Sequence, residues 1–98
     1  MAEALKLLGL IYRAKKLVLG EDVLENLDRV KLVIIASDTS IKNKDRYLKK
    51  CYFYNIDYVD KFNSFDLSNA IGKNNVKLIG VIDEGFKETF IKKMKEDQ

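Results

Sequence analysis

Two continuous apolar runs constrain the fold more strongly than any other feature of this chain. They are "KLVIIA" at residues 31–36 and "VKLIGVID" at residues 76–83. A strand with one face in water alternates apolar and polar side chains, whereas the first run is apolar at five successive positions. The first run is therefore predicted to be a central strand covered on both faces, and the second run to be another strongly apolar strand of the same sheet.

Helices and strands are predicted to alternate along the rest of the chain. Apolar residues at three- and four-residue spacing indicate helices, and short apolar runs indicate strands. Two places carry polar residues of the kind that cap helix starts, namely Asp38, Thr39 and Ser40 before one helix and Ser64 before another. The predicted elements are a helix through Leu5, Leu8, Ile11 and Tyr12, a strand at 17–19, a brief helix through Val23, Leu24 and Leu27, a helix from 38–40 to about Asn55, a strand at 57–62, a helix from Ser64 to Gly72, and a last helix burying Phe86, Phe90, Ile91 and Met94. This alternation predicts the α/β fold class, as a three-layer α/β/α sandwich with a short central mixed sheet.

Length and composition indicate one domain, residues 1–98. Hydrophobic residues make up 47% of the chain and charged residues 34%, a balance typical of globular proteins rather than disordered ones. No apolar run approaches the ~20 residues that a membrane span needs. The N-terminus also lacks the order of basic, apolar and small residues that marks a secretory signal. A cytoplasmic protein without a membrane partner is expected.

Catalysis and metal binding are disfavoured by the residue types that the chain lacks. Cys51 is the one cysteine and there is no histidine, so no internal disulfide can form and the thiol has no imidazole base. The usual zinc and iron ligand sets are missing for the same reason. We expect a protein that is not an enzyme and that takes no cofactor, metal or small-molecule substrate.

The basic residues are unevenly distributed, although the net charge is only +3. Residues 4–20 contain four basic residues and no acid, and residues 41–52 contain five basic residues against Asp45 alone. Such clustering suits a polyanion. For residues 41–52 the sequence favours the simpler interpretation, a solvated helix face.

Two loops combine glycine with residues that could contact a phosphate backbone. In "LVLGED" a strand is followed by Gly20 and a helix start, whose unpaired N–H groups can donate hydrogen bonds to a phosphate. Glu21 and Asp22 could instead satisfy those groups, and their carboxylates repel phosphate. In "LSNAIGKNN" Ile71 could pack on an exposed base while Lys73 holds the backbone, or the segment could be an ordinary helix end.

Five segments together resemble one known family. They are "LGLIYRAKKLVLGEDVL", "KLVIIASDTS", "YFYNIDY", "DLSNAIGK" and "VIDEGF". Their order resembles that of YlxQ-like bacterial members of the kink-turn-binding ribosomal protein family, and the resemblance covers residues 8–90. It implies an α/β/α sandwich that binds RNA without catalysis, is associated with ribosomes or translation, and has ribosomal or other kink-turn RNA and ribosomal particles as partners. The RNA-binding residues that it implies are Lys15, Lys16, Gly20, Glu21, Asp22, Ile71, Gly72 and Lys73.

The chain departs from the family's G-x-N-E-x-x-K turn. In "GEDVLEN", Asp22, Val23 and Asn26 stand where that pattern has Asn, Glu and Lys. An aspartate cannot donate to guanine as an asparagine amide can, and Asn26 removes a phosphate contact. The second helix is also expected to be about one turn shorter than usual. The alternative function is a protein-interaction or ribosome-docking module that keeps the fold but has lost kink-turn recognition.

Overall fold

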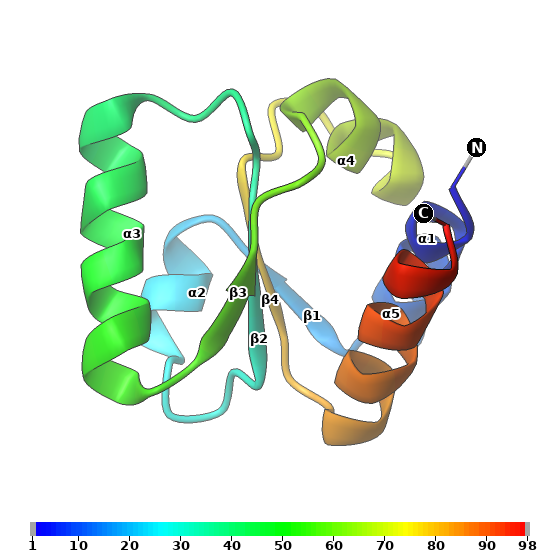
Figure 1. Cartoon of the computed structure of the whole chain (residues 1–98), viewed down its shortest axis with the longest axis horizontal. Coiled ribbons are helices and arrows are strands. Elements are labelled where there is room, and N and C mark those ends of the chain that lie inside the picture. The colour runs from blue at the N-terminus through cyan, green and yellow to red at the C-terminus, as the bar shows by residue number, and fades with distance from the viewer. Residues whose placement is uncertain (1, 98) are drawn as a thin grey trace.

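Helices and strands alternate along the chain as the sequence predicts (Figure 1). The structure, a computed structural model, describes residues 2–97. Its elements are α1 (Glu3–Arg13), β1 (Leu17–Leu19), α2 (Glu21–Glu25), β2 (Leu32–Ile35), α3 (Ile41–Tyr54), β3 (Asp57–Val59), α4 (Ser64–Ile71), β4 (Leu78–Val81) and α5 (Glu84–Glu96). Within residues 2–97 no helix has both the length and the apolar character needed to cross a membrane.

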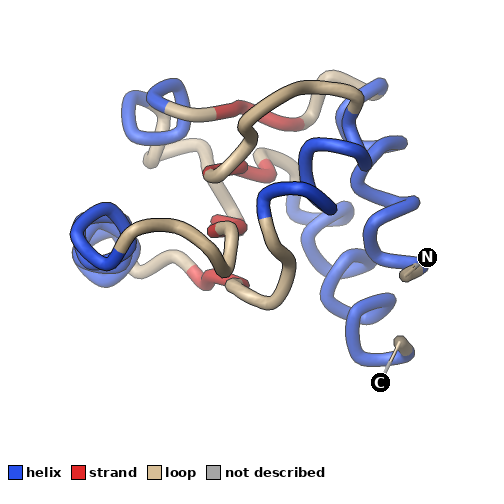
Figure 2. The backbone as a smooth tube through the Cα atoms, turned by 90° about the horizontal axis from the view of Figure 1, so that it is seen from above, coloured by secondary structure: helices blue, strands red, loops and turns tan. Residues whose placement is uncertain are grey.

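The four strands form one mixed sheet in the order β1-β4-β2-β3. β4 lies antiparallel to both β1 and β2, and β2 pairs in parallel with β3. The two apolar runs supply the inner strands β2 and β4, and every residue of both strands is buried. Figure 2 shows helices on both sides of the sheet, which confirms the predicted three-layer sandwich.

Alternate side chains of the inner strands divide the core into two halves. The even-numbered residues of β2 pack with side chains of α1, α4 and α5, among them Leu8, Leu67 and Phe90. The odd-numbered residues of β2 pack with α2 and α3 side chains, among them Val23 and Cys51. Because successive side chains of a strand point to opposite faces, a run that is apolar at every position needs this cover on both sides.

Two predicted elements prove shorter than expected. α2 ends at Glu25, although Leu27 is still buried from the turn that follows the helix. β3 covers Asp57–Val59 and not the whole of residues 57–62. The Gly20 turn therefore begins a helix of only five residues.

The structure selects one of the three predicted cap residues for α3 and replaces the predicted cap of α4. Ser40, and not Asp38, caps α3, because its side chain accepts from the backbone N–H three residues later at 3.2 Å. Asn63, and not Ser64, caps α4 in the same way at 2.8 Å. Asp38 instead accepts from the Ser64 hydroxyl at 2.6 Å and from the Ser64 backbone N–H at 2.7 Å. It therefore joins the loop after β2 to the start of α4.

This contact makes stability depend on pH. The side-chain and then the backbone hydrogen bond from Ser64 hold the pKa of the Asp38 carboxyl below its ordinary value. A depressed folded-state pKa stabilises the protein above the ordinary value, and that contribution is lost as the pH falls through the folded-state pKa. Asp38→Ala is expected to lower the midpoint of urea unfolding at neutral pH, and the difference from the parent should shrink below about pH 4. Asp28→Ala, at an exposed carboxylate, is the matched control, and a difference independent of pH would contradict the prediction.

Gly9 lets α1 and α4 approach closely. A Cβ atom at this position would lie 2.7 Å from the Ala70 carbonyl oxygen, closer than real contacts allow. The end of α4 therefore rests directly on α1, and the loop that follows α4 starts beside the C-terminal half of α1.

Candidate nucleic-acid interface

The turn after β1 depends on the backbone of Gly20. This residue has φ 59° and ψ −134°, a conformation that glycine adopts without steric cost and other residues rarely adopt. Its N–H donates to the Leu78 carbonyl at 3.0 Å, so the turn is held at the beginning of β4. A Cβ at this position would meet no atom within 4 Å, so the backbone angle, and not crowding, is what requires glycine.

The loop after α4 is held by α4 itself. Gly72 ends the helix in the left-handed conformation with φ 73°, as the sequence predicts. The Lys73 N–H donates to the Ser68 carbonyl at 3.0 Å, and the Ser68 hydroxyl accepts from the Val76 N–H at 2.9 Å. Asn75 is also left-handed, with φ 56°. These constraints define the path of residues 72–77 and leave Lys73 exposed.

The two loops meet, although about fifty residues separate them in sequence. They line one hollow of about 310 Å³, formed by Leu19, Gly20, Lys73, Asn74, Asn75, Val76, Lys77 and Leu78. Antiparallel pairing of β1 with β4 explains this meeting, because the end of β1 lies opposite the beginning of β4. The structure therefore brings Gly20 and Lys73, two of the predicted site residues, to one place.

Lys73 also faces the end of α1. Its Nζ lies 5.9 Å from the centre of the Tyr12 ring, within the range of a cation–π contact. Tyr12, Arg13, Lys15 and Leu17 line a neighbouring hollow of about 390 Å³. The basic surface therefore continues from the Gly20 hollow across the Tyr12 ring to the end of α1.

Lys15 is exposed in a conformation that is costly for lysine. It lies one residue beyond the C-cap of α1 with φ 62°, where glycine is usual. Its N–H donates to the Tyr12 carbonyl and the next N–H donates to the Ile11 carbonyl, so the α1 end is a Schellman motif. A left-handed non-glycine residue costs on the order of 1–2 kcal/mol of folding free energy. Lysine at position 15 therefore adds a positive charge but makes the protein less stable than glycine at this position would.

Lys16 lies at the opposite end of β1 from Gly20. Its carbonyl accepts from the Ile82 N–H at 3.0 Å, whereas Gly20 is bonded to Leu78 at the other end of the β1–β4 ladder. The two Cα atoms are four residue steps apart, which at ~3.3 Å rise per step along a strand is about 13 Å. Lys16 is thus exposed but is not part of the Gly20 hollow.

Ile71 does not occupy the expected surface position. Its side chain is only 7% exposed and belongs to the core cluster with Leu8 and Leu67. The expectation that this side chain packs on an exposed base is therefore wrong. The reason is helical periodicity, since Ile71 follows Leu67 by four residues and shares its buried face.

The acidic residues of the turn do not satisfy its N–H groups. The Glu21 carboxylate contacts Arg46 of α3 instead, at 3.3 and 3.4 Å. Asp22 is exposed, and its carbonyl accepts from the Asn26 amide at 2.7 Å. Asn26 is the C-cap of the short helix, and its side chain is bonded to the Asp22 carbonyl. It cannot supply the positive charge of the lysine that the family pattern has at this position.

Several residues of this surface were missed at the level of sequence. They are Tyr12, Arg13, Asn74, Asn75 and Lys77. "GKNN" carries a usable signal, because an αL glycine followed by two asparagines is typical of an exposed polar turn. The contribution of α1 had no local signal, since it depends on how α1 packs against α4.

Cys51 is not placed for catalysis. It is buried in the α2–α3 half of the core, and burial raises the pKa of its thiol to about 11. The thiol is therefore protonated at neutral pH, and thiolates are the nucleophilic form. Within residues 2–97 there is also no group of three His, Cys, Asp or Glu side chains that could hold a metal ion.

A covered mixed sheet with a basic surface at the meeting point of two loops is typical of a small α/β RNA-binding protein. No protein-family model matches this chain. It is 33% identical over 88 residues to the RNA-binding protein YlxQ of Enterococcus faecium, covering 86% of this chain and 84% of that protein. It is 35% identical over 88 residues to the RNA-binding protein YlxQ of Bacillus subtilis, covering 87% and 88%. The chain belongs to the YlxQ family of RNA-binding proteins.

Solved structures have the same fold. A protein of unknown function from Bacillus halodurans superposes with a TM-score of 0.87 at 37% identity, covering 97% of this chain and 99% of that one. The 15.5kD RNA binding protein of Giardia lamblia superposes with a TM-score of 0.77 at 17% identity, covering 95% and 82%. At that identity the second likeness concerns the fold alone.

Proposed function

We propose that this protein recognises kink-turn or similarly bent RNA through the two loops that meet at the Gly20 hollow. The observation that carries the proposal is their convergence, because a turn that enters a bent groove and a loop that covers extruded bases must lie side by side. Lys73 and Lys77 form no ion pair within residues 2–97 and are exposed, so both are available to phosphates. Lys15 extends the basic surface past Tyr12.

The roles of the other site residues follow from their positions. Gly20 and Gly72 shape the two loops, and Ile71 anchors the second loop from the core. Glu21 and Asp22 border the turn, where an RNA amino group or a hydrated cation would suit them better than a phosphate. Lys16 would contact an RNA phosphate farther from the Gly20 hollow, because it lies at the other end of β1.

Ribosomal RNA is the partner that best fits this proposal. The resemblance to ribosomal proteins that bind kink-turn RNA supports an association with ribosomes or translation. The relatives from Enterococcus faecium and Bacillus subtilis are RNA-binding proteins, which supports RNA as the class of partner.

A second candidate function rests on the short α2. The Glu21 carboxylate contacts Arg46, and the Asn26 side chain donates to the Asp22 carbonyl within α2 itself, so neither Glu21 nor Asn26 is free of contacts within the protein. A turn engaged in this way suits a docking module that has lost kink-turn recognition.

A gel-shift titration separates the two functions. The protein is titrated against a kink-turn RNA and a straight duplex of equal length, at low and at moderate salt. Binding that prefers the kink-turn RNA by at least about tenfold and weakens with salt is expected. Equal or absent binding to both RNAs would contradict kink-turn recognition and favour the docking module.

A further inference from the structure

The outward face of α3 carries a basic stripe that ends in an aromatic ring. Lys42, Arg46, Lys49 and Phe53 follow one another at three- and four-residue intervals, so they share one side of the helix. Cys51 lies on the opposite side and is buried. α3 stands in the layer across the sheet from α1, α4 and α5 (Figure 1).

Two aromatic side chains at the end of this stripe are almost fully in water. Phe53 is 79% exposed and the adjacent Tyr52 is 90% exposed. The Phe53 ring lies edge-on to the neighbouring Tyr54 ring, with centroids 5.3 Å apart. Three consecutive aromatic residues cannot all face one side of a helix, so at least one had to be exposed or to pack elsewhere, and the structure exposes all three. Adjacent exposed apolar side chains with a polar rim are typical of interaction sites.

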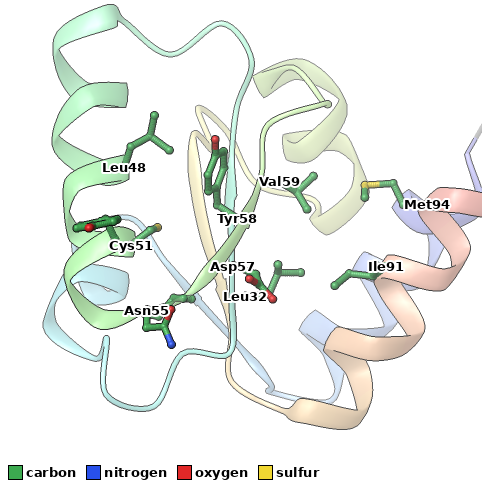
Figure 3. A pocket seen from close by; sticks show the side chains of 11 residues that line it. Leu32, Leu48, Cys51, Asn55, Asp57, Tyr58, Val59, Ile91 and Met94 are labelled. Carbon is green, nitrogen blue, oxygen red and sulfur yellow. The ribbon is translucent and has the colours of Figure 1, made fainter.

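A groove borders the aromatic residues on the side of β3 (Figure 3). It has a volume of about 770 Å³ and runs along the outer edge of the sheet between α3 and α5. Leu48 and Cys51 of α3 line it together with Asn55, the C-cap of that helix, and the Tyr58 ring stands between α3 and the sheet (Figure 3). The groove is large enough to receive a nucleobase, and Asn55 supplies an amide with both a donor and an acceptor.

The charge of α3 identifies the kind of partner. The helix has five basic residues and one acid, Asp45. Lys49 pairs with Asp45 at 3.0 Å and Arg46 with Glu21 at 3.3 Å, but both pairs are exposed and weak in water, so a phosphate can displace them. Lys42 forms no ion pair within residues 2–97. A second copy of this basic helix would be repelled, whereas a polyanion is attracted.

We propose that Lys42, Arg46, Lys49, Tyr52 and Phe53, together called the α3 face, bind single-stranded RNA. The three basic side chains hold phosphates, and the two aromatic rings stack on unpaired bases, which is how proteins hold single strands without reading their sequence. The stripe from Lys42 to Phe53 is ~16 Å long at 1.5 Å per residue, enough for a few nucleotides. None of these five residues lines the Gly20 hollow, although Arg46 reaches Glu21 beside the Gly20 turn. The proposed site does not depend on kink-turn recognition.

The test uses a fluorescein-labelled oligouridine of about 12 nucleotides, which has no stable structure. Fluorescence anisotropy at low salt measures its affinity for the full chain and for two variants, Phe53→Ala and Tyr52→Ala. Each variant is expected to bind at least about fivefold more weakly, because it removes one stacking surface. Ile41→Ala is the matched control, since Ile41 is an 89% exposed aliphatic residue of the same helix and should bind like the parent.

The same variants are then titrated with the kink-turn RNA. If the aromatic variants bind kink-turn RNA like the parent but bind oligouridine more weakly, the two RNA sites are distinct. If the parent itself does not prefer kink-turn RNA, that result contradicts the proposed function of the Gly20 hollow and leaves the oligouridine result as the test of the α3 face. Unchanged oligouridine binding by both aromatic variants would overturn the α3 face as an RNA site. The proposal would also be overturned if light scattering showed the parent to be a dimer and the Phe53→Ala variant to be a monomer. The aromatic residues would then form a protein interface.

Discussion

Lys73→Glu is expected to weaken kink-turn RNA binding by roughly tenfold or more at moderate salt and to reduce the slope of log affinity against log salt by about one. Lys73 lines the Gly20 hollow and also faces the Tyr12 ring, so its charge lies where both parts of the basic surface meet. A glutamate at this position repels phosphate instead of neutralising it. Gel-shift titrations at several salt concentrations measure both quantities.

Two other lysines calibrate this result. Lys16→Glu should weaken binding less than Lys73→Glu, because Lys16 lies about 13 Å from Gly20 along β1. Lys92→Glu, at an exposed position of α5, should bind like the parent. Unfolding by urea should be nearly unchanged in all three variants, since surface substitutions usually alter stability by less than about 0.5 kcal/mol. Normal binding by both Lys73→Glu and Lys16→Glu would show that the site assignment is wrong.

Phe90→Ala is expected to lower the free energy of unfolding by about 3–5 kcal/mol, the usual cost of removing a buried ring. Phe90 is fully buried in the larger half of the core, and its ring meets the Phe62 ring edge-on with centroids 6.3 Å apart. The substitution would leave a cavity between α5 and the sheet. Urea denaturation followed by circular dichroism measures the loss, and the melting temperature should fall by about 4–8 °C for each kcal/mol.

Phe53→Ala provides the comparison for this variant. It removes the same side chain from an exposed position, so its free energy of unfolding should stay within about 0.5 kcal/mol of the parent. A similar loss of stability in the two variants would contradict the packing described for Phe90. A stable Phe53→Ala also ensures that its RNA binding can be interpreted.

The strand predictions succeeded because their evidence is local. Five consecutive apolar positions at residues 32–36 can be accommodated only between two layers, whatever the rest of the chain does. Cap assignments were less secure because several polar residues stand together at each helix start. Ser40 and not Asp38 caps α3, because the Asp38 carboxylate is bonded to Ser64, a residue distant in sequence.

The candidate site was partly predictable for the same reason. Gly20 and Gly72 are visible in the sequence because a left-handed or otherwise unusual backbone angle calls for glycine. Ile71 was misassigned because an apolar residue beside a glycine and a lysine looks exposed, while its spacing from Leu67 in fact turns it inward. The contact of the Tyr12 ring with Lys73 could not be predicted from the residues around Tyr12, because it depends on the packing of α1 against α4.

The sequence by itself determined the order of helices and strands, the two inner strands and the backbone angles of the glycine turns, because these depend on side-chain spacing and local sterics. Only the tertiary structure decided which loops meet. Antiparallel pairing of β1 with β4 brings Gly20 to Lys77, and close packing of α1 on α4 through Gly9 brings Lys73 to Tyr12. It also decided that Tyr52 and Phe53 stay in water, because the face of α3 that packs on the sheet is already occupied by Cys51 and its neighbours.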